Sequence, residues 1–345
     1  MSPTTMSMFI SSLATGTIIT ASSFHWLMAW IGLEINTLAI LPMISKQHHP
    51  RSTEACTKYF LTQAAASAMI LFSSTTNAWL TGTWDITQLS APMSTTLLTM
   101  AIAMKLGLAP MHFWLPEVLQ GSTMKTAMII TTWQKLAPMS LIFITANNLQ
   151  TTLMLLLAML STFTGGWGGL NQTQLRKMMA YSSIAHLGWM IAISTLMTNI
   201  MTLNLMIYIT MTLSAFYMFS LSNSKTIQDI STTWTASPMM TLLIMLILMS
   251  LGGLPPLTGF MPKWLILEEL TTQNLTTTST IMALSALLSL FFYLRLSYTS
   301  TLTMSPNLTT NEHKWRFKPT MKPKMLMYPL IISLAALPIT PMLTL

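Results

Sequence analysis

The chain has 345 residues, of which 52% are hydrophobic and only 7% are charged. Soluble domains carry about 25% charged residues, so this composition excludes an ordinary soluble globule and indicates that lipid surrounds much of the surface. The formal net charge of +8 could suggest a nucleic-acid partner. In a chain this apolar, however, it more often reflects basic loops on one side of a membrane, and we expect no nucleic-acid partner.

The apolar runs predict an all-α integral membrane protein with about eleven transmembrane helices, because one span needs roughly 20 apolar residues. The fourth and ninth runs are too long for a simple span, and both contain glycine and proline. In chain order, the predicted spans cover residues 3–22, 24–45, 56–80, 94–121, 123–146, 150–172, 175–195, 198–222, 238–270, 276–300 and 325–344.

The basic connections between these spans support the count. When the spans alternate in direction, segments 46–58, 173–177, 223–229 and 302–324 all fall on the side of the N-terminus. Basic loops mark the side from which a membrane protein is not translocated. We therefore expect the N-terminus on the cytoplasm-equivalent side of the membrane and the C-terminus on the opposite side.

One glycine–proline pattern interrupts both the fourth and the ninth predicted span. Residues 107–110 read GLAP and are followed by Pro116, while residues 253–256 read GLPP and are followed by Pro262. Proline removes a helical hydrogen-bond donor and clashes with the preceding turn, and glycine adopts backbone angles that other residues resist. Each of the two spans is therefore predicted to be a pair of half-helices joined by unwound backbone.

The two interrupted spans lie five spans apart, so they should cross the membrane in opposite directions. Matched broken helices of opposite direction are typical of inverted-repeat transporters. We expect an antiporter-like repeat of two five-helix units, residues 1–146 with a break near 107–110 and residues 147–300 with a break near 252–259. A basic loop and a C-terminal transmembrane helix follow in residues 301–345. The alternative is a chance recurrence of glycine and proline.

Four ionisable residues lie well inside predicted spans, namely Glu34, Lys105, Lys135 and Lys263. Each charge near the middle of a bilayer costs about 2.5–3.5 kcal/mol on insertion scales, so these groups must be paired, hydrated or neutral for part of the time. Static ion pairing would suit the glutamate and one lysine. It leaves the other lysines unpaired, and burial disfavours their charged form. The pattern therefore favours proton transfer over a purely structural role.

Two histidines are further candidates. His186 lies in the middle of the seventh span, close in sequence to Tyr181, Ser182 and Ser183, and it could relay protons between the lysines or serve as a hydrogen-bonded core residue. His112 follows the first break and is the weaker candidate.

The sequence gives no sign of a cofactor or metal site. Cys56 is the single cysteine, which excludes an internal disulfide, a cysteine zinc site and a cysteine-bound iron–sulfur cluster. There is no dinucleotide or phosphate-binding glycine motif in a suitable setting. We therefore expect no cofactor, no metal and no redox active site in this chain.

Three motifs carry a family resemblance: residues 105–117 (KLGLAPMHFWLPE), 168–177 (GGLNQTQLRK) and 252–260 (GGLPPLTGF). With them the chain resembles the antiporter-like membrane-arm subunits of respiratory complex I, in particular the chain 2 family of vertebrate mitochondrial NADH:ubiquinone oxidoreductase. The resemblance covers essentially the whole chain, and the eleven predicted spans match the shortened animal form. The 34 methionines are also typical of proteins translated inside animal mitochondria.

The resemblance implies a function and a location. It places Glu34, Lys105, Lys135 and Lys263 on the family's proton path and implies a proton-translocating subunit of NADH:ubiquinone reductase. It also implies a multi-pass protein of the mitochondrial inner membrane, with its N-terminus on the matrix side and its C-terminus on the intermembrane-space side. Implied partners are neighbouring antiporter-like and accessory membrane-arm subunits and phospholipids. A stand-alone cation/proton antiporter and a purely structural membrane subunit remain alternatives.

Overall fold

The computed structural model describes residues 2–47, 49–231, 233–301 and 327–340, and the regular elements in these ranges are all helices. The all-α architecture expected from the apolar runs is confirmed. The described residues form two compact units, Met1–Ser161 with Met190–Thr198 and Thr162–Trp189 with Asn199–Leu345. The prediction of two repeats, 1–146 and 147–300, stays a prediction.

The helices of the first half of the chain follow the predicted spans, with short 3-10 turns (η) at several ends. In order they are α1 (Pro3–Ser22), α2 (Trp26–Ile44), η1 (Ser45–Gln47), α3 (Pro50–Thr81), α4 (Pro92–Leu106), α5 (Trp114–Gly121), α6 (Met124–Thr131), η2 (Trp133–Lys135), α7 (Leu136–Thr145), η3 (Ala146–Asn148) and α8 (Thr151–Gly169).

The second half adds longer helices and several short ones. They are α9 (Leu175–Ser194), α10 (Thr198–Leu221), α11 (Ile227–Ser231), α12 (Thr233–Ala236), α13 (Pro238–Gly252), α14 (Phe260–Thr272), α15 (Thr276–Thr301), α17 (Met327–Ala335) and η4 (Leu337–Ile339). The two predicted interruptions are present, since α4 and α5 are separate helices and so are α13 and α14.

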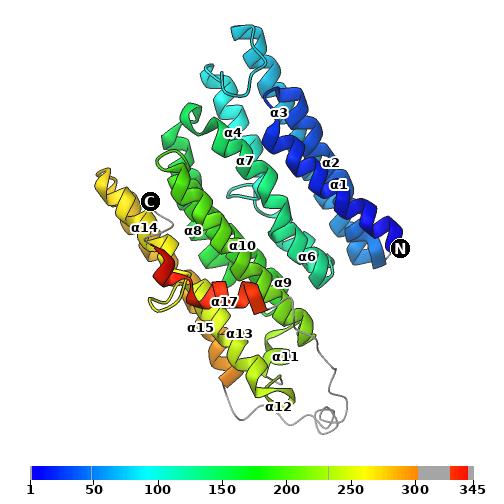
Figure 1. Cartoon of the computed structure of the whole chain (residues 1–345), viewed down its shortest axis with the longest axis vertical. Helices are drawn as coiled ribbons and strands as arrows, with labels where there is room; N and C mark the ends of the chain where they lie inside the picture. Colours follow the sequence, from blue (N-terminus) through cyan, green and yellow to red (C-terminus); the bar gives the residue numbers. More distant parts are fainter. Residues whose placement is uncertain (1, 48, 232, 302–326, 341–345) are drawn as a thin grey trace. The chain divides into compact units, whose positions relative to one another are not determined.

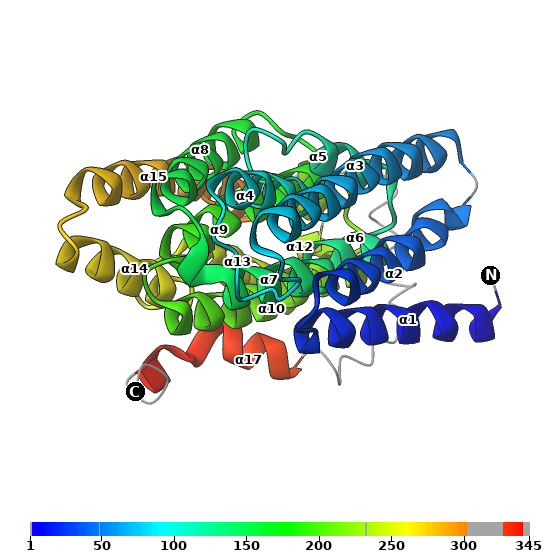
Figure 2. The same cartoon turned by 90° about the horizontal axis from the view of Figure 1, so that it is seen from above.

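In the first unit, α1 and α2 pack side by side (Figures 1 and 2). Two glycines allow the close approach. A Cβ on Gly16 would lie 2.9 Å from the carbonyl oxygen of Gly32, and a Cβ on Gly32 would lie 2.8 Å from that of Gly16. Small residues of this kind let membrane helices approach through their backbones, and the contact fixes α2, which carries Glu34.

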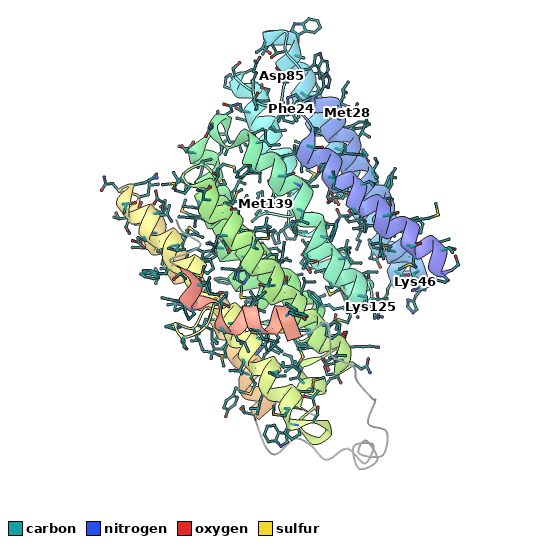
Figure 3. The ribbon with its side chains drawn as sticks, in the orientation of Figure 1. Phe24, Met28, Lys46, Asp85, Lys125 and Met139 are labelled. Carbon is teal, nitrogen blue, oxygen red and sulfur yellow. The ribbon has the colours of Figure 1, made fainter. Side chains whose placement is uncertain are left out.

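The two ends of the first unit differ in charge. Lys46 and Lys125 lie at one end, while Phe24, Met28 and Asp85 lie at the other (Figure 3). This distribution agrees with the alternation of span directions from which the basic side was predicted.

In the second unit, two basic connections are joined by backbone hydrogen bonds. Leu175 N–H donates to the carbonyl of Lys225 at 3.1 Å, and Ile227 N–H donates to that of Thr173 at 3.2 Å. Segments 173–177 and 223–229 therefore lie at the same end of this unit, as the charge pattern predicts.

Five of the described helices are long and apolar enough to cross a membrane, namely Trp26–Ile44, Met124–Asn148 (α6 through η3), Thr151–Gly169, Thr198–Leu221 and Thr276–Thr301. The C-terminal span, 325–344, is described only in part. There, the described part of α17 is Met327–Ala335, and it packs across α13 (Figure 1). The count of eleven spans thus stays a prediction.

Candidate functional site

The first helix break ends α4 in a Schellman motif. Gly107 has φ +78°, and its N–H donates to the carbonyls of Ala103 (2.9 Å) and Met104 (3.2 Å), while Leu108 N–H also donates to Ala103 (2.9 Å). This pattern closes the helix after Leu106. The carbonyl of Leu106, at the negative end of the α4 dipole, then faces away from the helical ladder.

Lys135 occupies the position opposite this carbonyl. Its ammonium donates a hydrogen bond to the Leu106 carbonyl oxygen, and its Nζ lies 5.9 Å from the centre of the Trp114 ring. The Lys135 side chain is 2% exposed. The lysine predicted from its central position in a span is thus buried, and it contacts both half-helices of the first break, α4 through Leu106 and α5 through Trp114.

The second break repeats the motif at α13. Gly253 has φ +79°, and its N–H donates to the carbonyls of Met249 (3.1 Å) and Ser250 (3.0 Å). The Gly252 carbonyl at the end of the helix accepts a hydrogen bond from Lys263 Nζ at 2.8 Å. A Cβ on Gly253 would lie 2.8 Å from the same Nζ. Glycine at this position therefore permits the positive φ angle and also leaves room for the ammonium group of Lys263.

Lys135 and Lys263 therefore share an environment. In each break, an ammonium group that is nearly excluded from solvent is stabilised by a carbonyl at the negative end of a half-helix. Cations are favoured at helix C-termini, and a buried charge needs such a partner. The broken backbone that the sequence predicts supplies this partner.

Glu34 and Lys105 lie in the first unit but are not in direct contact. Among the described residues, ion pairs within 4.0 Å join Lys58 to Glu54 and to Glu117, and none involves Glu34. Glu34 instead accepts a hydrogen bond from the Thr37 hydroxyl at 3.1 Å. Its carboxylate still acts electrostatically on Lys105.

A small cavity brings the polar groups of the first unit together. Its volume is about 10 Å³, roughly the space that the centre of one water molecule needs. Lys105 and Lys135 both line it, together with Thr37, which holds Glu34. Three of the four charges predicted from the sequence are thus connected to one cavity, two as lining residues and Glu34 through Thr37.

In the second unit, His186 lies close to the second break. It donates a hydrogen bond to the backbone carbonyl of Leu251, and Lys263 acts on it electrostatically. Its ring centre lies 5.5 Å from that of Tyr208. Buried hydroxyl groups surround this region: Ser183 bonds to Tyr208, and Ser182 and Tyr293 are 1% and 2% exposed.

His112 lies in the connection between α4 and α5. Its ring is 4.3 Å from that of Phe113, and it makes a hydrogen bond to the backbone of Pro110. It is not among the residues that line the cavity of the first unit, and it stays the weaker candidate.

Sequence reasoning missed several polar residues of this cavity. Asn36 and Gln63 line it and are 1% and 5% exposed, and Gln134 lines it and donates to the Asn36 backbone carbonyl at 3.2 Å. Each of these residues is an uncharged amide within a predicted apolar span, and this could have marked them as candidates. A reading based on charge and hydropathy alone does not single them out. Among the described residues, no three His, Cys, Asp or Glu side chains gather as a metal site requires. The expectation of no cofactor stays a prediction.

Comparison with known proteins identifies the family. Residues 23–289 match the family described as "NADH:quinone oxidoreductase/Mrp antiporter, TM". The chain belongs to this family. Residues 290–344 match a second description, "NADH dehydrogenase subunit 2 C-terminus".

Whole-chain relatives agree with this assignment. The chain is 58% identical over 341 residues to the NADH-ubiquinone oxidoreductase chain 2 of Latimeria chalumnae, covering 99% of this chain and 98% of the relative. It is 56% identical over 344 residues to the chain 2 of Oncorhynchus mykiss, covering 100% and 99%. A chain in the structure of respiratory complex I from Thermus thermophilus has the same fold, with a TM-score of 0.81, 24% identity and coverage of 97% of this chain and 79% of that chain.

Proposed function

We propose that this chain is a core membrane subunit of the proton-pumping NADH:ubiquinone oxidoreductase and that its buried charged groups carry protons across the membrane. Whole-chain relatives at 54–58% identity are named as chain 2 of this enzyme, and one solved structure of similar fold is of respiratory complex I. The chain is thus a subunit of the complex I oxidoreductase. Electron transfer takes place elsewhere in that complex.

The observation that carries the proton path is the lysine–carbonyl contact at each helix break. Lys135 and Lys263 each donate to the last carbonyl of a half-helix. Such a carbonyl stabilises the protonated lysine without a carboxylate, so the lysine can lose its proton without leaving an unpaired anion behind. A lysine fixed in a carboxylate ion pair would lack this freedom, because removing one partner strands the other charge.

In the proposed mechanism, Glu34 supports the charge on Lys105. When a signal from a neighbouring subunit weakens this support, the charged form of Lys105 becomes less favourable in its buried site. Its proton then moves through the cavity to Lys135. His186 and Lys263 carry the later steps at the second break, and the movable half-helices control access from each side.

The proposal includes a topology and a setting. Eleven spans in two inverted five-helix repeats place the N-terminus on the matrix side of the mitochondrial inner membrane and the C-terminus on the intermembrane-space side. Neighbouring antiporter-like subunits, accessory subunits and phospholipids cover the lipid-facing helices. The grouping of basic residues at one end of each unit supports this orientation.

Two other functions are less well supported. A stand-alone cation/proton antiporter would need a carboxylate-rich ion site, whereas Glu34 is the single carboxylate at the centre of the predicted spans. A purely structural subunit would hold its buried charges in fixed ion pairs. The described ion pairs instead involve half-exposed residues, with Lys58 41% and Glu117 50% exposed.

The test is Lys135→Met in the complex assembled with the variant subunit and reconstituted in liposomes. We expect normal assembly but a loss of coupled proton translocation on the order of 10²-fold, the scale of a positioned proton-transfer group. Lys125→Met is the matched control, since Lys125 belongs to the same predicted span but is exposed at its end. Intact pumping by a correctly assembled Lys135→Met complex would exclude the relay.

A further inference from the structure

The cavity between Lys105 and Lys135 is lined by buried polar groups that have no hydrogen-bond partner within the protein. They are the ammonium of Lys105, the amide nitrogen of Gln63, and both the amide nitrogen and the oxygen of Asn36. The three side chains are between 1% and 5% exposed. Buried polar groups in folded proteins are nearly always hydrogen-bonded to protein or to ordered water. Three such side chains at one cavity therefore point to a shared ligand.

The size and chemistry of the cavity match one water molecule. Its volume of about 10 Å³ is close to the minimum for a single water, which needs two to four polar partners. The lining offers both kinds of partner, since an ammonium and an amide N–H can donate to a water oxygen and an amide oxygen can accept one of its protons. A metal cation is excluded by the two neighbouring ammonium groups, and a larger ligand does not fit.

We propose that Asn36 and Gln63 are positioning residues that hold one water molecule between Lys105 and Lys135, and that this water passes the proton from one lysine to the other. The inference rests on the proposed proton-translocating function. In the transfer, an N–H bond of protonated Lys105 breaks as its proton bonds to the water oxygen. An O–H bond of the same water breaks as its proton bonds to the neutral amine of Lys135, so the water is restored.

The surrounding contacts fix the Asn36 amide in place. A Cβ on Gly16 would lie 2.4 Å from Asn36 Oδ1, so the Asn36 amide fills the space that this glycine leaves on α1. The Asn36 backbone carbonyl accepts a hydrogen bond from Gln134 at 3.2 Å. Because Gln134 directly precedes Lys135, this bond ties the α2 backbone at Asn36 to the turn that carries the receiving lysine.

A structural role for Gln63 makes the opposite prediction from a water-holding role. If Gln63 only fills space between α3 and its neighbours, Gln63→Met keeps the volume and is tolerated, while Gln63→Ala leaves a void and is worse. If Gln63 holds the water, Gln63→Met is the more harmful change, because an apolar side chain displaces the water without replacing its hydrogen bonds. Gln63→Ala leaves room for a second water to take the place of the amide.

The experiment measures proton translocation coupled to NADH oxidation, in H₂O and D₂O, for the assembled complex carrying Gln63→Met or Gln63→Ala. We expect Gln63→Met to slow translocation roughly tenfold, the scale of one lost hydrogen bond in a transfer step, and to raise the solvent isotope effect. Gln63→Ala should keep most of the rate. Ser67→Ala is the matched control, since Ser67 lies one turn along α3, is 4% exposed, and donates to its own helix at Ala64.

Two results would overturn the proposal: translocation in Gln63→Met at the parental rate, or a greater loss in Gln63→Ala than in Gln63→Met. If a variant does not assemble, a high-resolution density map of the parent complex decides. Water density within hydrogen-bond distance of Gln63 Nε2 and Asn36 supports the proposal, and a dry cavity contradicts it. Lys135→Met, measured in parallel, separates the two hypotheses. If Lys135→Met loses translocation while Gln63→Met keeps the parental rate, only the water site is excluded. If Lys135→Met keeps the parental rate, the proton path itself is excluded.

Discussion

The break between α4 and α5 and the break between α13 and α14 end in the same backbone motif, yet their lysines come from different places. At the first break, Lys135 reaches the Leu106 carbonyl from η2, 29 residues further along the chain. At the second, Lys263 reaches the Gly252 carbonyl from the following half-helix, 11 residues along. The acceptor is thus set by the way the helix ends, and different helices can supply the donor.

The difference extends to the residue that matches Lys263 in the repeated pattern. Ten residues after Gly253 comes Lys263, whereas ten residues after Gly107 comes Glu117. Glu117 is half-exposed and pairs with Lys58 at 2.6 Å. At the second break this position holds a buried lysine, whereas at the first break it holds an acid in a more exposed ion pair. The same backbone motif therefore does not require the same charge at matching positions.

The largest expected effect comes from fixing the charge at the second break. Lys263→Arg keeps a donor for the Gly252 carbonyl, but arginine remains protonated at any accessible pH. We expect assembly to be retained and coupled proton translocation to fall on the order of 10²-fold. Lys225→Arg, at an exposed lysine of the same unit, is the control. Parental translocation in Lys263→Arg would mean that this contact is structural and that the two breaks differ in function.

An intermediate effect should distinguish the two glycines. Gly107→Ala and Gly253→Ala both place a Cβ at positive φ, which costs about 1–2 kcal/mol of stability. The new Cβ at Gly253 would also meet Lys263 Nζ at 2.8 Å, whereas the one at Gly107 would meet Leu115 Cδ1 at 3.0 Å. We expect similar losses in the free energy of unfolding, but a clear loss of proton translocation only in Gly253→Ala.

Thermal unfolding and coupled translocation, measured on the same preparations, test this difference between the glycines. Equal losses of translocation in the two alanine variants would show that backbone strain, rather than displacement of the ammonium, dominates at both breaks.

The smallest effect is expected at the exposed ion pairs of the first unit. The hydrogen bond and charge of Lys58 lower the pKa of Glu54 below its ordinary value of 4.5. A lowered carboxyl pKa contributes stability at pH values above 4.5, and this contribution is lost as the pH falls through the lowered value. Because Glu54 is 62% exposed, salt should weaken the effect.

Infrared titration of the carboxylates checks this last expectation. Glu54→Gln should remove one band that titrates below pH 4.5 and should leave proton translocation unchanged. Glu268→Gln, at an exposed glutamate of the second unit, should leave that band in place. A Glu54 band at or above its ordinary position would show that the ion pair with Lys58 does not form in solution.

Much of the helical layout could be predicted from the sequence, because apolar runs and helix breakers act locally. The predicted span 198–222 corresponds to α10, Thr198–Leu221, and the glycine–proline pattern located both breaks. The helix α3 begins at Pro50, before the predicted span 56–80. Its first turns are polar, so hydropathy excluded them although the helix continues past the apolar segment.

The turn at Lys135 could also have been found. No interruption was predicted in the span 123–146, but α6 ends at Thr131 and η2 precedes α7. Pro138 is the physical reason that was not used. It has no N–H to donate to the carbonyl of Gln134, four residues earlier, and its ring crowds that turn. The irregular turn directs Lys135 towards the first break.

The cavity amides could not have been predicted in the same way. Asn36 and Gln63 lie on different helices, and their approach to Lys105 depends on how α2, α3 and α4 pack. No local pattern encodes that packing. The sequence therefore identified which residues carry charge, while the structure was needed to show which neutral residues accompany them.

The Lys263–Gly252 contact also has a mechanical consequence. It connects the two helices on either side of the unwound backbone between α13 and α14, so it restrains the angle between them. A charge-assisted hydrogen bond is roughly twice as strong as a neutral one, so this restraint is stronger when Lys263 is protonated than when it is neutral. The rigidity of a helix that is expected to cross the membrane therefore depends on one proton, and its bend responds to the proton transfer at Lys263.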